Sequence, residues 1–202
     1  MPRRITEWER RIEANPDHST WYIERFRTMA AQGQDLAGEA RMIDAMVGRS
    51  ARILDAGCGP GRVGGYLYEV GHTVVGVDVD PALIEAAEHD YPGPTWLAQD
   101  LSELDLPAAG ISQPFDAIVC AGNVLTFVAP GTQREVLSRF AAHLAPQGRA
   151  AIGFGLDRGY PLDAFRADVV GAGLAEELML STWDLRPLRA DSDFVVAILR
   201  HA

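Results

Sequence analysis

The segment from Ile53 to Arg62 carries the residues best suited to bind a ligand. Its apolar residues lead to Asp55, and a turn with glycines at 57, 59 and 61 follows before the next helical pattern. Glycines in such a turn let a ligand approach the backbone closely. An acidic side chain beside the turn favours a ligand with a positive charge. The segment therefore predicts a binding loop at the end of a strand.

A dinucleotide-binding turn is the alternative interpretation, because a GxGxxG pattern occurs at Gly59, Gly61 and Gly64. In dinucleotide folds that pattern follows the strand directly and offers backbone N–H groups to a pyrophosphate. Here it starts three residues after Ala56, and Pro60 has no N–H to donate. A carboxylate at the strand end also repels a diphosphate. An NAD(P)-dependent oxidoreductase is therefore disfavoured, and a cationic ligand without phosphates, such as S-adenosylmethionine (SAM), fits better.

Composition excludes several classes of enzyme. All 18 basic residues are arginines, so the chain lacks the lysine of Schiff-base aldolases, pyridoxal-phosphate enzymes, kinases and P-loop NTPases. The formal net charge of −10 argues against binding nucleic acid through its phosphates. The two cysteines, Cys58 and Cys120, form no CxxC pair and no Cys/His cluster. We therefore expect reduced thiols, no disulfide and no metal site.

The elements that position these residues alternate along the chain. From residue 51, short apolar runs and amphipathic patterns predict βαβ units around a parallel sheet. The expected strands span 51–56, 73–78, 94–98, 115–120, 148–154, 176–183 and 193–200. Asp80 and Pro81 predict a helix start, and residues 132–145 a core-facing helix. The last two strands lack a helical connection, so they should be antiparallel. The expected fold class is α/β, a doubly wound, seven-stranded, mostly parallel sheet with an antiparallel edge strand.

The N-terminal part precedes this pattern. Residues 19–47 have helical spacing in two pieces, broken at residues 32–34. We expect residues 1–47 to form a helical extension and residues 48–202 a single compact domain. The extension either packs on the sheet as part of the core or forms a lid over the carboxyl ends of the strands. No apolar stretch approaches the roughly 20 residues of a membrane span, so a soluble, cytoplasmic protein without a membrane partner is expected.

Ordered motifs resemble those of the class I SAM-dependent methyltransferases. ILDAGCGPGR, residues 53–62, is similar to the family's first motif, an acid followed by GxGxG after the first strand. VVGVDVD ends the second strand at Asp78, and Gln99-Asp100-Leu101 follows the third. FDAIVC at 115–120 and LAPQGR at 144–149 resemble the fourth- and fifth-strand motifs. The set covers residues 51 to about 155 in the family's order.

The resemblance implies SAM as the cofactor and a role for each motif. Asp78 would accept hydrogen bonds from both ribose hydroxyls, Asp100 would accept one from the adenine amino group, and Leu101 would pack on the ring. The implied cofactor-binding residues are Asp55, Gly57, Cys58, Gly59, Gly61, Asp78, Val79, Asp100, Leu101, Cys120 and Gly122. The alternatives are a helix-capping role for Asp78, an ordinary loop position for Asp100 and simple packing for both cysteines.

Methyl transfer from a sulfonium is an in-line displacement, in which the protein mainly holds the reacting atoms about 3 Å apart. A general base is needed only if the acceptor must lose a proton. Topology puts four histidines at the opposite end of the sheet from the ligand: His72, His89, His143 and His201. His18 remains as the candidate general base, and His18 and Tyr22 are the candidate catalytic residues. The alternative is an exposed surface histidine.

The acceptor site should be shaped by the extension and by loops after the later strands. The candidate residues are Trp21, Arg25, Asn123, Phe127, Tyr160 and Trp183. These aromatics, together with Arg158, Arg186 and Arg189, suit a small molecule with an apolar body and an acid group. The NPPY-type motif of nucleic-acid amino methylation is absent after Asn123. We expect methyl transfer to a small-molecule acceptor and no nucleic-acid partner; the alternative is a non-catalytic SAM-binding protein.

Overall fold

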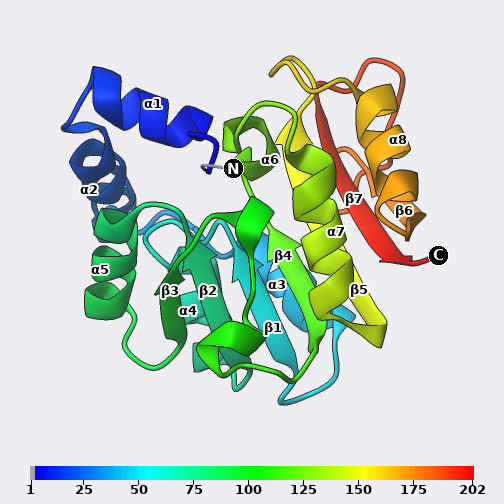
Figure 1. Cartoon of the computed structure of the whole chain (residues 1–202). Helices are drawn as coiled ribbons and strands as arrows, with labels where there is room; N and C mark the ends of the chain where they lie inside the picture. Colours follow the sequence, from blue (N-terminus) through cyan, green and yellow to red (C-terminus); the bar gives the residue numbers. More distant parts are fainter. Residues whose placement is uncertain (1–2) are drawn as a thin grey trace.

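The computed structural model describes residues 3–202, and its strands form one mixed seven-stranded sheet (Figure 1). The strand order is β3-β2-β1-β4-β5-β7-β6. The strands are β1 (Arg52–Ala56), β2 (Thr73–Asp78), β3 (Thr95–Ala98), β4 (Phe115–Cys120), β5 (Leu144–Gly155), β6 (Leu174–Leu180) and β7 (Phe194–His201). Strands β1 to β5 pair in parallel, whereas β7 is antiparallel to both β5 and β6. The expected fold class is confirmed. The antiparallel strand lies one place in from the edge, which β6 occupies.

Helices cover both faces of this sheet. They are α1 (Glu7–Ala14), α2 (His18–Ala31), α3 (Gly38–Met46), α4 (Arg62–Glu69), α5 (Pro81–Asp90), α6 (Val124–Phe127), α7 (Gln133–His143) and α8 (Leu162–Gly171), with short 3₁₀ turns η1 (Leu101–Glu103) and η2 (Pro107–Ala109). Apolar side chains of α3 and α4 form one core cluster with the sheet, and those of α7 and α8 form another. Successive residues of β1, such as Ile53 and Leu54, therefore point to opposite clusters.

Local sequence signals explain several element boundaries. Asp80 caps α5 by accepting a hydrogen bond from the Ala82 N–H at 2.9 Å, and Pro81 occupies the first helical position, as predicted. The expected break in the N-terminal helices lies at Gly33, whose φ of 72° is in the left-handed region. Glycine adopts this conformation without a steric penalty, so α2 ends just before it.

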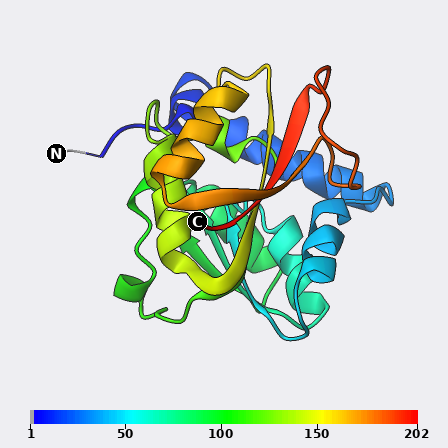
Figure 2. The same ribbon diagram turned by 90° about the vertical axis from the view of Figure 1, so that its right-hand side faces the viewer.

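Helices α1 and α2 lie above the edge of the sheet where the parallel strands end (Figures 1 and 2). Trp8 and Ile23 pack against Leu83 and Ala86 of α5 in a small cluster separate from the two main ones. The Trp8 indole also donates to the carboxylate of Asp80 at 2.9 Å. The two helices are therefore attached through a satellite contact rather than through the main core.

Helix α3 differs from α1 and α2, although the sequence analysis placed all of residues 1–47 in one extension. Its buried residues Ala40, Met42 and Ile43 belong to the core cluster that includes Ile53 of β1. The part of the N-terminal region that is separate from the core thus ends before α3.

Candidate active site

Loops at the carboxyl ends of the parallel strands and helices α1 and α2 enclose a cavity of about 450 Å³. That volume lies within the roughly 300–1,000 Å³ typical of ligand sites. Fourteen of the residues singled out in the sequence line it: His18, Trp21, Tyr22, Arg25, Gly57, Gly59, Asp78, Val79, Asp100, Leu101, Gly122, Asn123, Phe127 and Arg158. Chain topology thus brings together residues more than 100 positions apart, because parallel strands end at one edge.

The glycine-rich turn after β1 has few free N–H groups. The backbone N–H groups of Gly57 and Cys58 both donate to the Val77 carbonyl, at 2.7 and 3.0 Å. The Gly59 N–H donates to Asp78, and Pro60 has none. A pyrophosphate cradle needs several free N–H groups aimed at the ligand. This turn is therefore poorly suited to a dinucleotide and suits a ligand without phosphates.

Asp78, the last residue of β2, brings a buried carboxylate to the cavity. Its Oδ2 accepts from the Gly59 N–H at 2.9 Å and its Oδ1 from the Asp80 N–H at 3.0 Å. Burial raises the pKa of Asp78 from 3.8 to about 6. Each carboxylate oxygen can accept a second hydrogen bond. The side chain, held by backbone N–H groups, can therefore still accept two hydroxyl groups of a ligand.

The other two acids of the motifs make different contacts. Asp55 is buried behind the turn and does not line the cavity; its carboxylate accepts from the Gly64 N–H of α4 at 2.8 Å, and burial raises its pKa to about 7. Asp100 does line the cavity, and it accepts from both the N–H and the hydroxyl of Ser102. Its second oxygen accepts from the Arg3 guanidinium at 2.9 Å. Asp55 therefore shapes the loop, and Asp100 faces the ligand space.

Three further residues of the cofactor motifs lie behind the cavity wall. Cys58 packs among α5 and Trp96, and Cys120 lies in the main core; burial raises the pKa of both thiols. Gly61 has a φ of 86°, and a Cβ there would lie 2.8 Å from that of Ala87. Cys58 and Gly61 let the turn pack closely against α5.

Two predicted acceptor residues, Tyr160 and Trp183, do not line this cavity. Tyr160 packs beside Phe154, with ring centroids 5.3 Å apart, and its hydroxyl donates to Asp168. Trp183 follows β6 and covers Gly153, where a Cβ would lie 2.7 Å from the indole. The end of β6 is two strands removed from β5 because β7 lies between them, so Trp183 is held away from the site.

Aromatic rings form the outer wall of the cavity. The His18 ring contacts two indoles, with its centroid 4.9 Å from that of Trp8 and 5.5 Å from that of Trp21. Tyr22 contacts Trp8 edge to face, and burial raises the pKa of its hydroxyl. Phe127 of α6 meets Trp8 edge to face at 5.8 Å. Helices α1, α2 and α6 thus meet through aromatic contacts over the ligand space.

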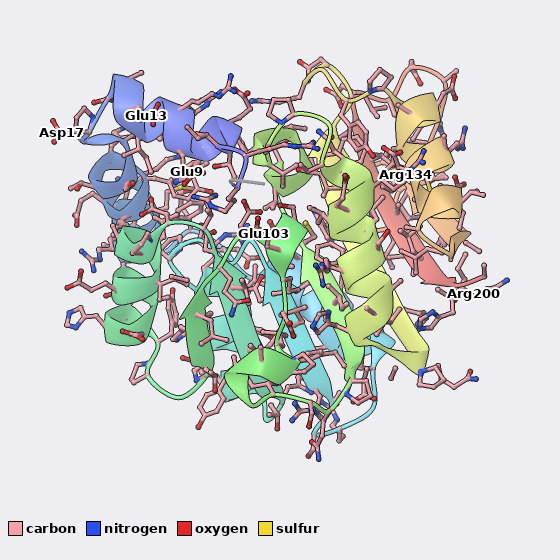
Figure 3. All side chains as sticks on the ribbon, in the orientation of Figure 1. Glu9, Glu13, Asp17, Glu103, Arg134 and Arg200 are labelled. Atoms are coloured by element: carbon pink, nitrogen blue, oxygen red, sulfur yellow. The ribbon has the colours of Figure 1, made fainter. Side chains whose placement is uncertain are left out.

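Helix α1 was missed in the sequence, although Thr6, Trp8 and Arg11 line the cavity. Its signal was the TEWE sequence, a capping box in which Thr6 and Glu9 bond each other's backbone N–H groups. Figure 3 shows Glu9 on the side of α1 that faces the sheet. There Glu9 pairs with Arg3, which holds the pKa of Glu9 near 2 and also bridges to Asp100. The N-terminal segment is therefore connected directly to the cavity wall.

The remaining histidines lie outside the cavity. His72 accepts from the Ala51 N–H before β1, and His201 contacts the Leu144 carbonyl at the start of β5. His143 packs at the end of α7, and His89 is exposed on α5. In residues 3–202, no group of three or more His, Cys, Asp or Glu could hold a metal ion. In the same range, no helix combines the length and apolar character needed to cross a membrane.

Comparison with known proteins gives consistent matches. A family model described as "Methyltransferase domain" matches residues 53–148. A crystal structure of a TehB-like SAM-dependent methyltransferase from Corynebacterium glutamicum is 45% identical, with a TM-score of 0.87, over 93% of this chain and all of that one.

Two curated relatives are matched over shorter regions. An uncharacterized methyltransferase of Synechocystis is 28% identical over 64% of this chain and 59% of its own length. A mouse 18S rRNA (guanine-N(7))-methyltransferase is 48% identical over 40 residues, 20% of this chain and 14% of its own. The chain thus spans less than two thirds of either of these two relatives.

Proposed function

This chain belongs to the class I family of SAM-dependent methyltransferases, and we propose that its acceptor is a small molecule enclosed beneath α1 and α2. The observation that carries the proposal is the cavity itself. It is walled on one side by the strand-end loops and on the other by Trp8, Trp21 and Tyr22. These two walls leave a compact space that suits a small molecule.

The residues present fit SAM. Gly57, Gly59 and Gly122 line the cavity without side chains, and a Cβ at Gly122 would meet nothing within 4 Å. Asp78 offers two carboxylate oxygens to ribose hydroxyls, and Leu101 offers an apolar surface to the adenine ring. When bound, SAM supplies a methyl group on a sulfonium, which a nucleophile aligned with the carbon–sulfur bond accepts.

His18 and Tyr22 are the proposed catalytic residues. His18 lines the cavity, and stacking against Trp21 restricts its ring. An imidazole in this place can remove a proton from an acceptor hydroxyl or amine. Tyr22 keeps its proton because burial raises its pKa, so its hydroxyl can donate a hydrogen bond to the acceptor.

Charge supports a small acceptor over nucleic acid. The net charge of −10 disfavours contacts with phosphate backbones. The mouse relative that acts on 18S rRNA shares only 40 aligned residues with this chain, and three Arg residues at the cavity are too few for a basic binding surface. An rRNA acceptor is the competing possibility.

The test is transfer of labelled methyl from SAM to separated cell fractions of small molecules, RNA and protein, followed by mass spectrometry. We expect label in the small-molecule fraction, and we expect its loss in His18→Ala to be larger in kcat than in KM. His89→Ala, on the exposed face of α5, is the matched control and should retain full activity. Label confined to RNA or protein would contradict the proposal.

A further inference from the structure

A second cavity, of about 420 Å³, adjoins the first. The two share four lining residues, Arg11, Phe127, Val128 and Arg158. The other residues that line the second cavity come from α1, from the stretch between the end of α6 and the start of α7, and from the loop after β5. The one acid among them, Glu7 of α1, pairs with Arg10. None of the lining residues belongs to the glycine-rich turn or to the loops after β2 and β3. The second cavity therefore extends the ligand space away from the cofactor motifs.

The shared wall is cationic. The Arg11 guanidinium lies over the Phe127 ring, 4.7 Å from its centroid, and within residues 3–202 no carboxylate lies within 4.0 Å of it. In the same range the only carboxylate near Arg158 is Asp157, at 3.9 Å and 81% exposed. In a chain with 28 acidic and 18 basic residues, most arginines pair with acids. Two weakly neutralised arginines at one junction therefore make a local site for an anion.

The arginines are held in place by different elements. Arg11 comes from α1 and is positioned by its contact with an aromatic face, which restricts a long side chain without neutralising it. Arg158 comes from the loop after β5. Because both residues line both cavities, both guanidinium groups border the space where the cavities meet. Planar guanidinium groups bind carboxylates and phosphates through paired hydrogen bonds.

We infer that Arg11 and Arg158 form an anion subsite at the junction of the two cavities, and that the acceptor is an organic anion whose charged group binds there. This inference rests on the proposed function. The reactive end of the acceptor then lies in the first cavity, beside the cofactor residues and His18. The charged group lies at the junction, and any larger body of the acceptor enters the second cavity beside Tyr160. The subsite therefore selects acceptors by charge and fixes their direction.

The test is binding of benzoate, phenyl phosphate and neutral benzamide to the full chain saturated with S-adenosylhomocysteine, measured by ligand-observed NMR. Benzoate and phenyl phosphate distinguish a carboxylate from a phosphate, and benzamide should not bind. Arg11→Gln and Arg158→Gln should each weaken binding of the preferred anion roughly tenfold, the scale of one charge-assisted hydrogen bond. Arg41→Gln, which changes an exposed arginine of α3 that pairs with Asp35 and lies outside both cavities, should leave it unchanged.

SAM affinity, measured by calorimetry on the same variants, distinguishes failure of the anion subsite from failure of the proposed function. It should stay within about twofold of the wild-type value, since neither arginine belongs to the cofactor motifs. Anion binding that is absent, or equal in wild type and both variants, would overturn the subsite while leaving the methyltransferase intact. If the wild-type chain does not bind SAM, that result would instead refute the proposed placement of the cofactor.

Discussion

Asp78 connects the cofactor end of the cavity to the backbone around it. Its two oxygens accept from Gly59 and Asp80, so the turn after β1 and the start of α5 are held by one carboxylate. A group in this position is oriented before any ligand arrives, which lowers the entropy lost on binding. The same burial that orients it disfavours its charge.

Replacing Asp78 by Ala should weaken SAM binding by roughly 2–3 kcal/mol, because two charge-assisted hydrogen bonds to the ribose are lost. Calorimetry measures the change, and far-ultraviolet circular dichroism checks the fold. Asp116→Ala is the matched control, since Asp116 also accepts from a backbone N–H, that of Arg52, but at the opposite end of the sheet. Equal SAM affinity in Asp78→Ala and wild type would mean that another group binds the ribose.

The raised pKa of Asp78 predicts opposite effects of pH on binding and on stability. In the proposed complex the ribose hydroxyls donate to the Asp78 carboxylate, so SAM affinity should fall as pH drops below about 6. The fold favours the protonated form, because the folded pKa lies above the unfolded value of 3.8. Asp78 therefore contributes stability that is present below about pH 4 and is lost as pH rises to about 6.

The matched variant for this effect is Asp78→Asn. SAM affinity, measured by calorimetry, and the free energy of unfolding, measured with urea, are compared between pH 4 and 8. In Asp78→Asn both quantities should lose the part of their pH dependence that comes from Asp78, while contributions from other groups remain. An identical pH dependence of both quantities in the wild type and in Asp78→Asn would show that Asp78 does not titrate in this range.

Helices α1 and α2 form a unit of their own at the scale of elements. Their apolar contacts with α5 are separate from the main clusters. Their polar contacts also go to α5 and its cap: Asp80 accepts from Trp8 and from the Ser19 hydroxyl, and Arg27 pairs with Asp90. A satellite cluster of this kind can open without unfolding the sheet. We therefore favour the lid interpretation for these two helices, and the core interpretation for α3.

Deleting residues 1–34 should leave the sheet folded, because α3 and both main clusters remain. SAM affinity should fall by about tenfold or more, and turnover should collapse, since the cavity loses its outer wall. Circular dichroism, calorimetry and the methyl-transfer assay measure the three effects. A truncated chain that binds and turns over normally would refute the lid, and one that cannot fold would show that these helices are core.

The point variant Trp8→Ala tests the lid interpretation without deleting part of the chain. It removes the hydrogen bond to Asp80 and the centre of the satellite cluster while keeping the chain intact. The urea midpoint should change little, whereas SAM affinity should fall.

The capping box predicts a separate local effect. Thr6→Ala should lower the stability of α1 by about 1 kcal/mol, because the N–H of Glu9 loses its acceptor. Amide hydrogen exchange should then quicken in residues 7–14 and stay unchanged in β1 and β4. Faster exchange throughout the sheet would mean that α1 is part of the global folding unit.

At the scale of the whole molecule, the fold was predictable because its signals are local and repeated. Alternating apolar runs and helical patterns placed each strand to within a few residues, and Asp80-Pro81 marked α5. The position of β7 between β5 and β6 could not be read from the chain, since strand order depends on pairing between distant segments. Helix α1 was missed because Trp8 is its only buried residue among charged neighbours.

The site was predictable where strand ends determine it. Asp78 ends β2, and Asp100 and Gly122 follow β3 and β4, so a parallel sheet brings them together. Loop residues follow no such rule. Tyr160 and Trp183 lie at strand ends too, but their rings pack against Phe154 and Gly153, and such tertiary packing leaves no periodic signal in the sequence.

The central claim is that SAM binds between the strand-end loops and α2, with its ribose on Asp78. A crystal structure of the full chain with S-adenosylhomocysteine tests it most directly. We expect both ribose hydroxyls within about 3 Å of the Asp78 carboxylate oxygens. The sulfur should face the space lined by His18 and Phe127, with α2 in place over the ligand. A ligand bound elsewhere, or bound here with its ribose away from Asp78, would contradict the account.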